Sequence, residues 1–363
     1  MRPASAEEAA ALLRTLGEEG RPVRPRGGGT KPWGPPVEGT DVETGGLSRI
    51  LEHNVGDFTA VIEAGAPLAE VQAELAARGQ MLAIDPALGE GATVGGVMAA
   101  NDSGPLRHRY GSMRDLVVGV TVALSDGTLA RSGGKVIKNV AGYDLAKLFC
   151  GSFGTLGLIV RVAVRLHPLP PRTTSAVGTS GDAERLGVAA RGLAALPLEA
   201  DCLDVDWRDG AGRLLVRFGS AAAADQAAAA VTRMREHGLV DCEVVGDDDE
   251  LWMAQRVHQR GDCVLKVSGR ATDLPAVCRT GAAVVGRPAL GLYWLSLPAD
   301  GAAVAAARDA LAPRACTLLD AWPELRAAAW ASPDAGALAL MARVKERFDP
   351  ARIFRPGTSV KGI

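Results

Sequence analysis

Apolar residues recur with helical spacing at the start of the chain and with strand-like spacing soon after it. Residues 4–19 follow the helical pattern, and Ser5 with Glu8 three positions later predicts a capping box at the helix start. Residues 68–78 carry a second apolar face with helical spacing. Short apolar runs bounded by turn residues predict strands between these helices. The other elements expected in this half are strands at 22–26, 49–53, 60–64 and 157–166 and helices at 93–101 and 144–149.

A hairpin and a proline cluster organise the middle of the chain. Residues 116–124 and 128–132 flank the turn at 125–127, which predicts two paired strands. The proline cluster at 167–171 is the strongest domain boundary. Beyond it, strands and helices alternate with antiparallel neighbours, which predicts a small α+β domain. We expect a first domain at 1–171 (subdomains 1–80 and 81–171), a second domain at 172–325 and a C-terminal segment at 326–363.

The overall charge argues against nucleic acid and membrane partners. The formal net charge is −2, so no global field attracts polyanions or anionic lipid, and aromatic residues at 4% are too sparse for base stacking. The N-terminal residues lack an apolar leader, and no run reaches the roughly 20 apolar residues of a membrane-spanning helix. We expect a cytoplasmic protein without membrane insertion, peripheral to the inner membrane only through partners.

The six cysteines are scattered, and no two have C-x-x-C spacing. Zinc and iron–sulfur sites usually place cysteines in such pairs, so we expect no metal and only reduced thiols.

Three glycine-dense turns lie at residues 89–96, 103–104 and 151–157, and an earlier one at residues 26–30 follows a predicted strand. Glycine lets backbone amides approach a ligand closely, and consecutive N–H groups form a nest for anions. Each turn alone also fits an ordinary connection between strands. Together they favour a large ligand that lies along the backbone rather than a single phosphate pocket. No G-x-G-x-x-G unit follows a first strand, so NAD is not expected.

The order of these motifs carries a resemblance to a known family. They read RGGGT at 26–30, ATVGG at 92–96, SG at 103–104, GSMRD at 111–115, KNVAGYDL at 138–145, GSFGTLG at 151–157, and DP with RPG at 349–357. This set resembles the FAD-binding domain of the vanillyl-alcohol oxidase / p-cresol methylhydroxylase flavoprotein superfamily. Within it, the segment at 138–145 most resembles the FAD-binding subunits of bacterial glycolate oxidase (glycolate dehydrogenase).

The resemblance implies an α+β fold. A two-subdomain FAD-binding domain of p-cresol methylhydroxylase type would be joined by an α+β cap domain, and the C-terminal segment would return to the FAD domain. Some relatives attach FAD covalently through a histidine beside the first glycine turn, but here the turn continues as Thr30 and Lys31. Non-covalent FAD is therefore expected, and His53 is expected to be an ordinary surface histidine.

The implied FAD contacts come from the glycine turns and the segments after them. Residues 25–30 would grip the pyrophosphate from one side, residues 93–96 and 103–104 would hold it from the other, and the backbone at 158–159 would meet the ring. The implied cofactor-binding residues are Pro25, Arg26, Gly27, Gly28, Gly29, Thr30, Pro86, Ala92, Thr93, Val94, Gly95, Gly96, Asn101, Ser103, Gly104, Tyr110, Gly111, Ser112, Asp115, Gly154, Gly157, Leu158 and Ile159.

Hydroxy-acid dehydrogenases of this superfamily usually have a metal-bearing histidine cluster in the cap and an arginine before the Gly-Tyr-Asp-Leu motif. This chain has neither, which is the pattern expected of a companion FAD subunit beside a catalytic paralogue. The candidate catalytic residues are His108, as a base near neutral pH, with Arg107, Lys138 and Tyr143 as substrate contacts. Each also has a plain structural interpretation as a solvated side chain or a loop anchor.

The resemblance therefore implies an FAD-binding flavoprotein subunit of a glycolate (2-hydroxy acid) dehydrogenase complex. A hydride would pass from the substrate α-carbon to flavin N5, and electrons would continue to an iron–sulfur subunit. Two alternatives remain. One is a stand-alone FAD-dependent oxidase or dehydrogenase of another alcohol or hydroxy acid. The other is a non-catalytic subunit that holds flavin and contributes an interface.

Overall fold

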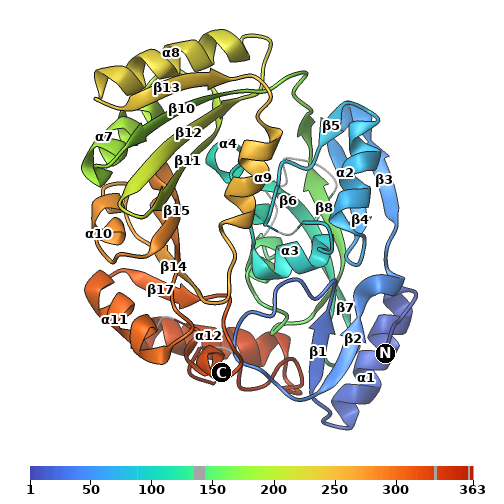
Figure 1. Ribbon diagram of the computed structural model, residues 1–363. Coiled ribbons are helices and arrows are strands. Elements are labelled where there is room, and N and C mark those ends of the chain that lie inside the picture. The colour runs from blue at the N-terminus through green and yellow to red at the C-terminus, as the bar shows by residue number, and fades with distance from the viewer. Residues whose placement is uncertain (88, 135–143, 331–332, 359, 363) are drawn as a thin grey trace. The chain divides into compact units, whose positions relative to one another are not determined.

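A computed structural model describes residues 1–87, 89–134, 144–330, 333–358 and 360–362 (Figure 1). The chain forms two compact units. The first comprises Met1–Ser103, Gly111–Leu169 and Trp330–Ile363, and the second comprises Gly104–Tyr110 and Pro170–Ala329. The chain passes between them inside the proline cluster, and the short segment Gly104–Tyr110 is grouped with the second unit.

The first unit begins with helix α1 (Ala6–Glu18). Ser5 Oγ accepts the N–H of Glu8 at 3.0 Å, and the Glu8 carboxylate accepts the N–H of Ala4 at 2.8 Å, so the predicted helix start is confirmed. Helix α1 packs on the parallel strands β1 (Val23–Arg26) and β2 (Thr40–Glu43).

The C-terminal segment completes this first core. Its Ile353 carbonyl accepts the N–H of Val23 at 2.7 Å, and the Val23 carbonyl accepts the N–H of Arg355 at 2.9 Å. Ile353 and Phe354 are buried beside the apolar face of α1. Strand β1, which leads into the first glycine turn, is therefore held on its free side by residues from the far end of the chain.

A five-stranded antiparallel sheet forms the rest of the first unit. Its order is β3 (Ile50–Asn54), β4 (Thr59–Glu63), β8 (Leu158–Arg165), β6 (Val117–Ala123) and β7 (Leu129–Gly133). The predicted hairpin is confirmed, because β6 and β7 pair around residues 125–127. Helices α2 (Leu68–Ala76) and α3 (Val94–Ala100) bury their apolar residues in a core with β4, β6 and β8. The other described elements of this unit are η1 (Thr44–Gly46), η2 (Val55–Asp57), β5 (Gln80–Met81), α5 (Met113–Leu116), α6 (Ala146–Phe149), β9 (His167–Pro168), α12 (Ala335–Phe348) and η5 (Val360–Gly362).

The second unit is built on an eight-stranded antiparallel sheet. Its order is β13 (Val240–Val245), β10 (Thr174–Ser180), β12 (Ala211–Phe218), β11 (Ala200–Arg208), β15 (Ala283–Arg287), β16 (Leu292–Ser296), β14 (Val264–Ser268) and β17 (Ala315–Leu318). Figure 1 shows helices α7 (Ala183–Ala194), α8 (Ala223–Glu236) and α10 (Leu274–Cys278) along one face of the sheet. Helix α4 (Arg107–Tyr110) contacts β11, and Leu106, directly before α4, packs with Trp252 of α9 (Asp249–Val257) on Cys202 and Leu215 of the sheet. The remaining elements are η3 (Pro288–Leu290), α11 (Gly301–Leu311) and η4 (Leu325–Ala328).

In the described ranges, no helix is both long enough and apolar enough to cross a membrane.

Candidate functional site

The glycine turns at residues 26–30 and 89–96 pack directly on each other. A β-carbon added to Gly28 would lie 1.6 Å from the Gly91 carbonyl oxygen, and one added to Gly27 would lie 2.2 Å from Thr93 Oγ1. Both distances are far below van der Waals contact, so no side chain fits at either position. Glycine is required here because two backbone turns touch.

The third turn, at residues 151–157, packs against the C-terminal end of α3 and against Pro25, directly before the first turn. The N–H groups of Gly151 and Phe153 donate to the carbonyls of Met98 and Ala99 at 3.1 and 2.8 Å, in the last turn of α3. A β-carbon on Gly154, where φ is +71°, would lie 3.2 Å from the Pro25 side chain. The fold thus brings together three turns that are far apart in the sequence.

The first and second turns differ in whether their backbone N–H groups already donate to an acceptor. The N–H groups of Val94, Gly95 and Gly96 donate to Ala66 O, Ala64 O and Thr93 Oγ1, at 3.0, 2.7 and 3.2 Å. By contrast, the N–H groups of Gly28 and Gly29 donate to no acceptor within the part of the chain that the structure describes. The first turn therefore offers an anion nest, whereas the second turn offers close packing but no free amide at these three positions.

The end of α3 offers a free acceptor. Asn101 ends the helix with φ at +47°, and its side-chain oxygen is buried with no hydrogen-bond donor among the described residues. A buried acceptor without a donor is costly unless a ligand supplies one. A ligand that carries both phosphate oxygens and N–H or hydroxyl donors would satisfy the first turn and Asn101 together, and FAD is such a ligand.

Other implied contacts have partners within the chain. Ser112 donates through its N–H and its hydroxyl to Asp115 Oδ2, at 2.8 and 3.0 Å, and so begins α5. Leu158 and Ile159 begin β8 and are buried opposite Ala123 and Val122. Pro86, Ala92, Ser103 and Gly104 are buried, whereas Gly111 has a positive φ of 79°. Lys138 and Tyr143 lie outside the described residues.

The segment with the candidate base belongs to the second unit. Tyr110 donates its hydroxyl to Asp201 Oδ1 at 3.2 Å, and Arg109 donates to the Glu199 carbonyl at 2.9 Å, so α4 is fixed to β11. His108 Nδ1 is buried, with no hydrogen-bond partner among the described residues. Burial and the adjacent Arg109 charge hold the pKa of His108 below its ordinary value of 6.5. The imidazole is therefore neutral at pH 7 and can accept a proton.

We expect His108 to titrate with a midpoint below pH 6.5 in the folded protein. Because the unfolded state then binds the proton more tightly, the stabilisation from neutral His108 is present above pH 6.5 and is lost as the pH falls through the folded pKa. Histidine-selective NMR checks this, with the resonance assigned by its absence in His108→Gln. A midpoint at or above 6.5 would contradict the burial argument.

Comparison with known proteins identifies the cofactor. A family model described as an FAD binding domain matches residues 1–133. Residues 1–133 form an FAD-binding domain. FAD is the cofactor, as predicted, and its non-covalent attachment stays a prediction.

Two of the matching relatives each align with less than half of this chain. The mitochondrial D-lactate dehydrogenase [cytochrome] of Arabidopsis thaliana is 35% identical over 178 residues, which are 48% of this chain and 31% of the relative. Glycolate oxidase subunit GlcE of Escherichia coli is 37% identical over 143 residues, which are 39% of this chain and 41% of the relative. The chain thus spans less than half the length of these curated relatives.

A solved structure of alkyldihydroxyacetonephosphate synthase matches 98% of this chain and 75% of its own, with a TM-score of 0.74 and 17% identity. This match and the FAD-binding family model together confirm the predicted fold class, a p-cresol methylhydroxylase-type FAD-binding fold of mixed helix and sheet.

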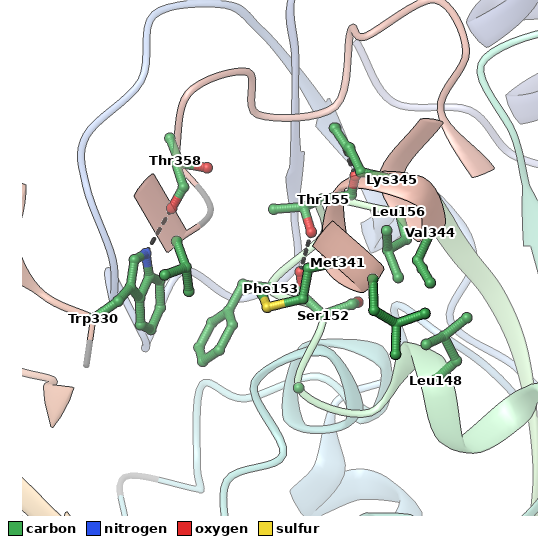
Figure 2. Close-up of a pocket in the computed structure, with 13 residues that line it drawn as sticks. Leu148, Ser152, Phe153, Thr155, Leu156, Trp330, Met341, Val344, Lys345 and Thr358 are labelled. Carbon is green, nitrogen blue, oxygen red and sulfur yellow. Dashed lines mark hydrogen bonds between the residues drawn. The ribbon is translucent and has the colours of Figure 1, made fainter. Parts of the chain in front are cut away.

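A pocket of about 320 Å³ lies between the third glycine turn, at residues 151–157, and helix α12. Figure 2 shows Phe153 and Trp330 on one side, with ring centroids 4.7 Å apart, and Leu148 and Val344 on the other. Its hydroxyl groups are used within the chain: for example, Thr155 donates to the Ser152 carbonyl at 2.7 Å. The Lys345 ammonium at the pocket donates to Asp349, Thr155 and Phe354, so the described lining residues offer no free ammonium group.

Two ionisable residues beside the glycine turns form an interaction that was not predicted from the sequence. Lys31, directly after the first turn, forms a buried ion pair with Asp102, directly before Ser103. The sequence did carry a signal, namely an ionisable residue next to each of two glycine motifs. Their pairing depends on the tertiary fold.

Among the described residues, no group of three or more His, Cys, Asp or Glu side chains is placed to hold a metal ion.

Proposed function

We propose that this chain is the FAD-binding flavoprotein subunit of a glycolate (2-hydroxy acid) dehydrogenase complex. The observation that carries the proposal is the 37% identity to a glycolate oxidase subunit over a stretch of 143 residues. The site geometry supports it, because the first glycine turn supplies free amides and Asn101 supplies a buried acceptor for a dinucleotide such as FAD. The D-lactate dehydrogenase relative supports a small 2-hydroxy acid as the substrate class.

FAD, when bound, would supply the redox chemistry of the proposal: it would take up the hydride from the substrate α-carbon at N5 and pass electrons to an iron–sulfur partner. In the proposal, neutral His108 accepts the hydroxyl proton at its unpaired Nδ1, and Arg107 attracts the substrate carboxylate. Lys138 and Tyr143 remain proposed substrate contacts.

The partners in the proposal are a catalytic flavoprotein paralogue and an iron–sulfur subunit. The name of the GlcE relative, a subunit of an oxidase, supports an assembly of several chains. The cytoplasmic location and any attachment to the inner membrane through partners are part of the same proposal.

An anaerobic titration with glycolate and D-lactate tests the assignment, and the absorbance of oxidised flavin at about 450 nm is the readout. We expect the isolated chain to bind FAD and stay oxidised, and the complex captured with a tagged copy of this chain to bleach. Bleaching of the isolated chain would favour the stand-alone enzyme. A complex that never bleaches would favour the flavin-holding interface subunit.

The variant His108→Gln, with His237→Gln as a matched control, then tests whether the substrate reduces the flavin of this chain or that of the partner paralogue. We expect His108→Gln to slow flavin reduction in the complex by about 100-fold, because a general base is lost. His237→Gln, which changes a histidine at the end of α8, should leave the rate unchanged. Equal rates in both variants would contradict a catalytic role for His108 and assign the oxidation to the partner.

A further inference from the structure

Lys31 and Asp102 join two segments implied in FAD binding. Lys31 Nζ lies 3.5 Å from Asp102 Oδ2, and the two side chains are only 7% and 3% exposed. The Lys31 ammonium also donates to Thr30 Oγ1 at 3.1 Å, and Asp102 Oδ1 accepts the N–H of Ser103 at 2.9 Å. The ion pair therefore connects the end of the first glycine turn to the start of the Ser103 and Gly104 turn.

This ion pair has a cost that stability alone does not explain. Removing two charges from water is expensive, and a pair of apolar side chains in the same place is often equally stable or more stable. The pair does, however, fix the distance between two loops that contain few side chains able to pack. That effect matters for a ligand held between the loops.

Asn101 points independently to a ligand at this place. Its side-chain oxygen is buried and receives no hydrogen bond from any described residue. An amide oxygen only accepts, so the ligand group that faces it must donate. A pyrophosphate at neutral pH offers acceptors only, whereas a flavin or adenine N–H or a sugar hydroxyl can donate. The pyrophosphate and the donor group are thus assigned to opposite ends of α3.

We propose that Lys31 and Asp102 are a positioning pair for FAD. They hold the first glycine turn and the Asn101 segment at the separation the cofactor needs, and Asn101 Oδ1 accepts a hydrogen bond from an N–H or hydroxyl group of FAD. The inference rests on the FAD-binding part of the proposed function and requires no oxidation of a hydroxy acid.

The test is FAD affinity of the full chain, measured by reconstitution of the apoprotein and by the rate of FAD release. Lys31→Met and Asp102→Asn should each bind FAD about tenfold or more weakly, because the loops are no longer preorganised. Lys147→Met is the matched control, since Lys147 and Asp144 form an exposed ion pair at 3.2 Å elsewhere in the first unit. It should bind FAD within about twofold of the wild type.

Two further variants separate positioning from stability. Asn101→Leu removes the acceptor and should weaken FAD binding, whereas Asn101→Asp retains an acceptor oxygen and should bind more tightly than Asn101→Leu. Lys31→Met combined with Asp102→Leu replaces the pair by apolar groups, and should restore apoprotein stability without restoring FAD affinity. Circular dichroism of the bound flavin should also change in the Lys31 variants and not in Lys147→Met.

Three outcomes would overturn the inference. In the first, Lys31→Met and Lys147→Met bind FAD equally well. In the second, Lys31→Met lowers only apoprotein stability while FAD affinity and flavin dichroism stay unchanged. In the third, Asn101→Leu binds FAD like the wild type. Wild-type protein that binds FAD without reduction by any hydroxy acid would contradict only the proposed activity, so the two failures are distinguishable.

Discussion

Gly28→Ala is expected to abolish FAD binding and to destabilise the first unit by about 3 kcal/mol. The added β-carbon would lie 1.6 Å from the Gly91 carbonyl oxygen, so the first and second glycine turns must separate. Backbone cannot yield as a flexible side chain does, and the free amides of Gly28 and Gly29 would move with the turn. Flavin content after purification and urea unfolding of the full chain measure the two effects.

Gly56→Ala is the matched control for this substitution. Gly56 also lies in the first unit, in the short helix η2, and a β-carbon there meets nothing within 4 Å. Neither glycine has a positive φ, so the comparison isolates steric contact from backbone conformation. If Gly28→Ala retains FAD as well as Gly56→Ala does, the packing of the two turns is not what requires glycine.

Lys345→Met is expected to cost about 3 to 5 kcal/mol of stability, because it leaves a buried carboxylate without its cation. Lys345 donates to Asp349 at 2.5 Å and to the carbonyls of Thr155 and Phe354, both at 2.8 Å. Asp349 is fully buried. Burial lowers the pKa of Lys345 although the Asp349 carboxylate opposes the shift, and three acceptors satisfy its three protons.

Urea unfolding of Lys345→Met and of Arg347→Met checks this expectation. Arg347 is exposed two residues further along the same helix, so its loss should change stability by less than about 0.5 kcal/mol. Limited proteolysis should cut near residues 349–357 in Lys345→Met first, since Lys345 fastens the C-terminal segment to the third glycine turn. Equal stability of the two variants would show that the buried contacts of Lys345 contribute little.

Local signals predicted much of the fold. The cap of α1 depends on Ser5 and Glu8, which are neighbours in sequence, and the β6–β7 hairpin depends on the Asp126–Gly127 turn. FAD could also be predicted, because several glycine motifs in a fixed order are a stronger indicator than any one of them. In these cases the residues that interact are close together, or the motif itself is the binding feature.

Features that depend on distant partners could not be predicted. The backbone N–H groups at the start of α3 are not free, because they donate to the carbonyls of Ala64 and Ala66, which belong to a different loop. The association of α4 with the second unit depends on Asp201, which accepts a hydrogen bond from Tyr110. A register irregularity between β11 and β12 leaves Asp201 without a partner residue in the strand pairing. In addition, a four-residue helix is too short to show a periodic pattern in the sequence. The Lys31–Asp102 pair likewise requires the two loops to meet first.

The position of Ile353 and Phe354 beside β1 bears on how the protein is made. The strand that leads into the first FAD-binding turn is synthesised well before Ile353 and Phe354, which lie beside it in the fold. Contacts of such high sequence separation close late in folding. A nascent chain therefore carries its cofactor-binding motif in an incomplete setting until residues 353–355 have been synthesised. Stable loading with flavin is then expected only after synthesis has passed residue 355.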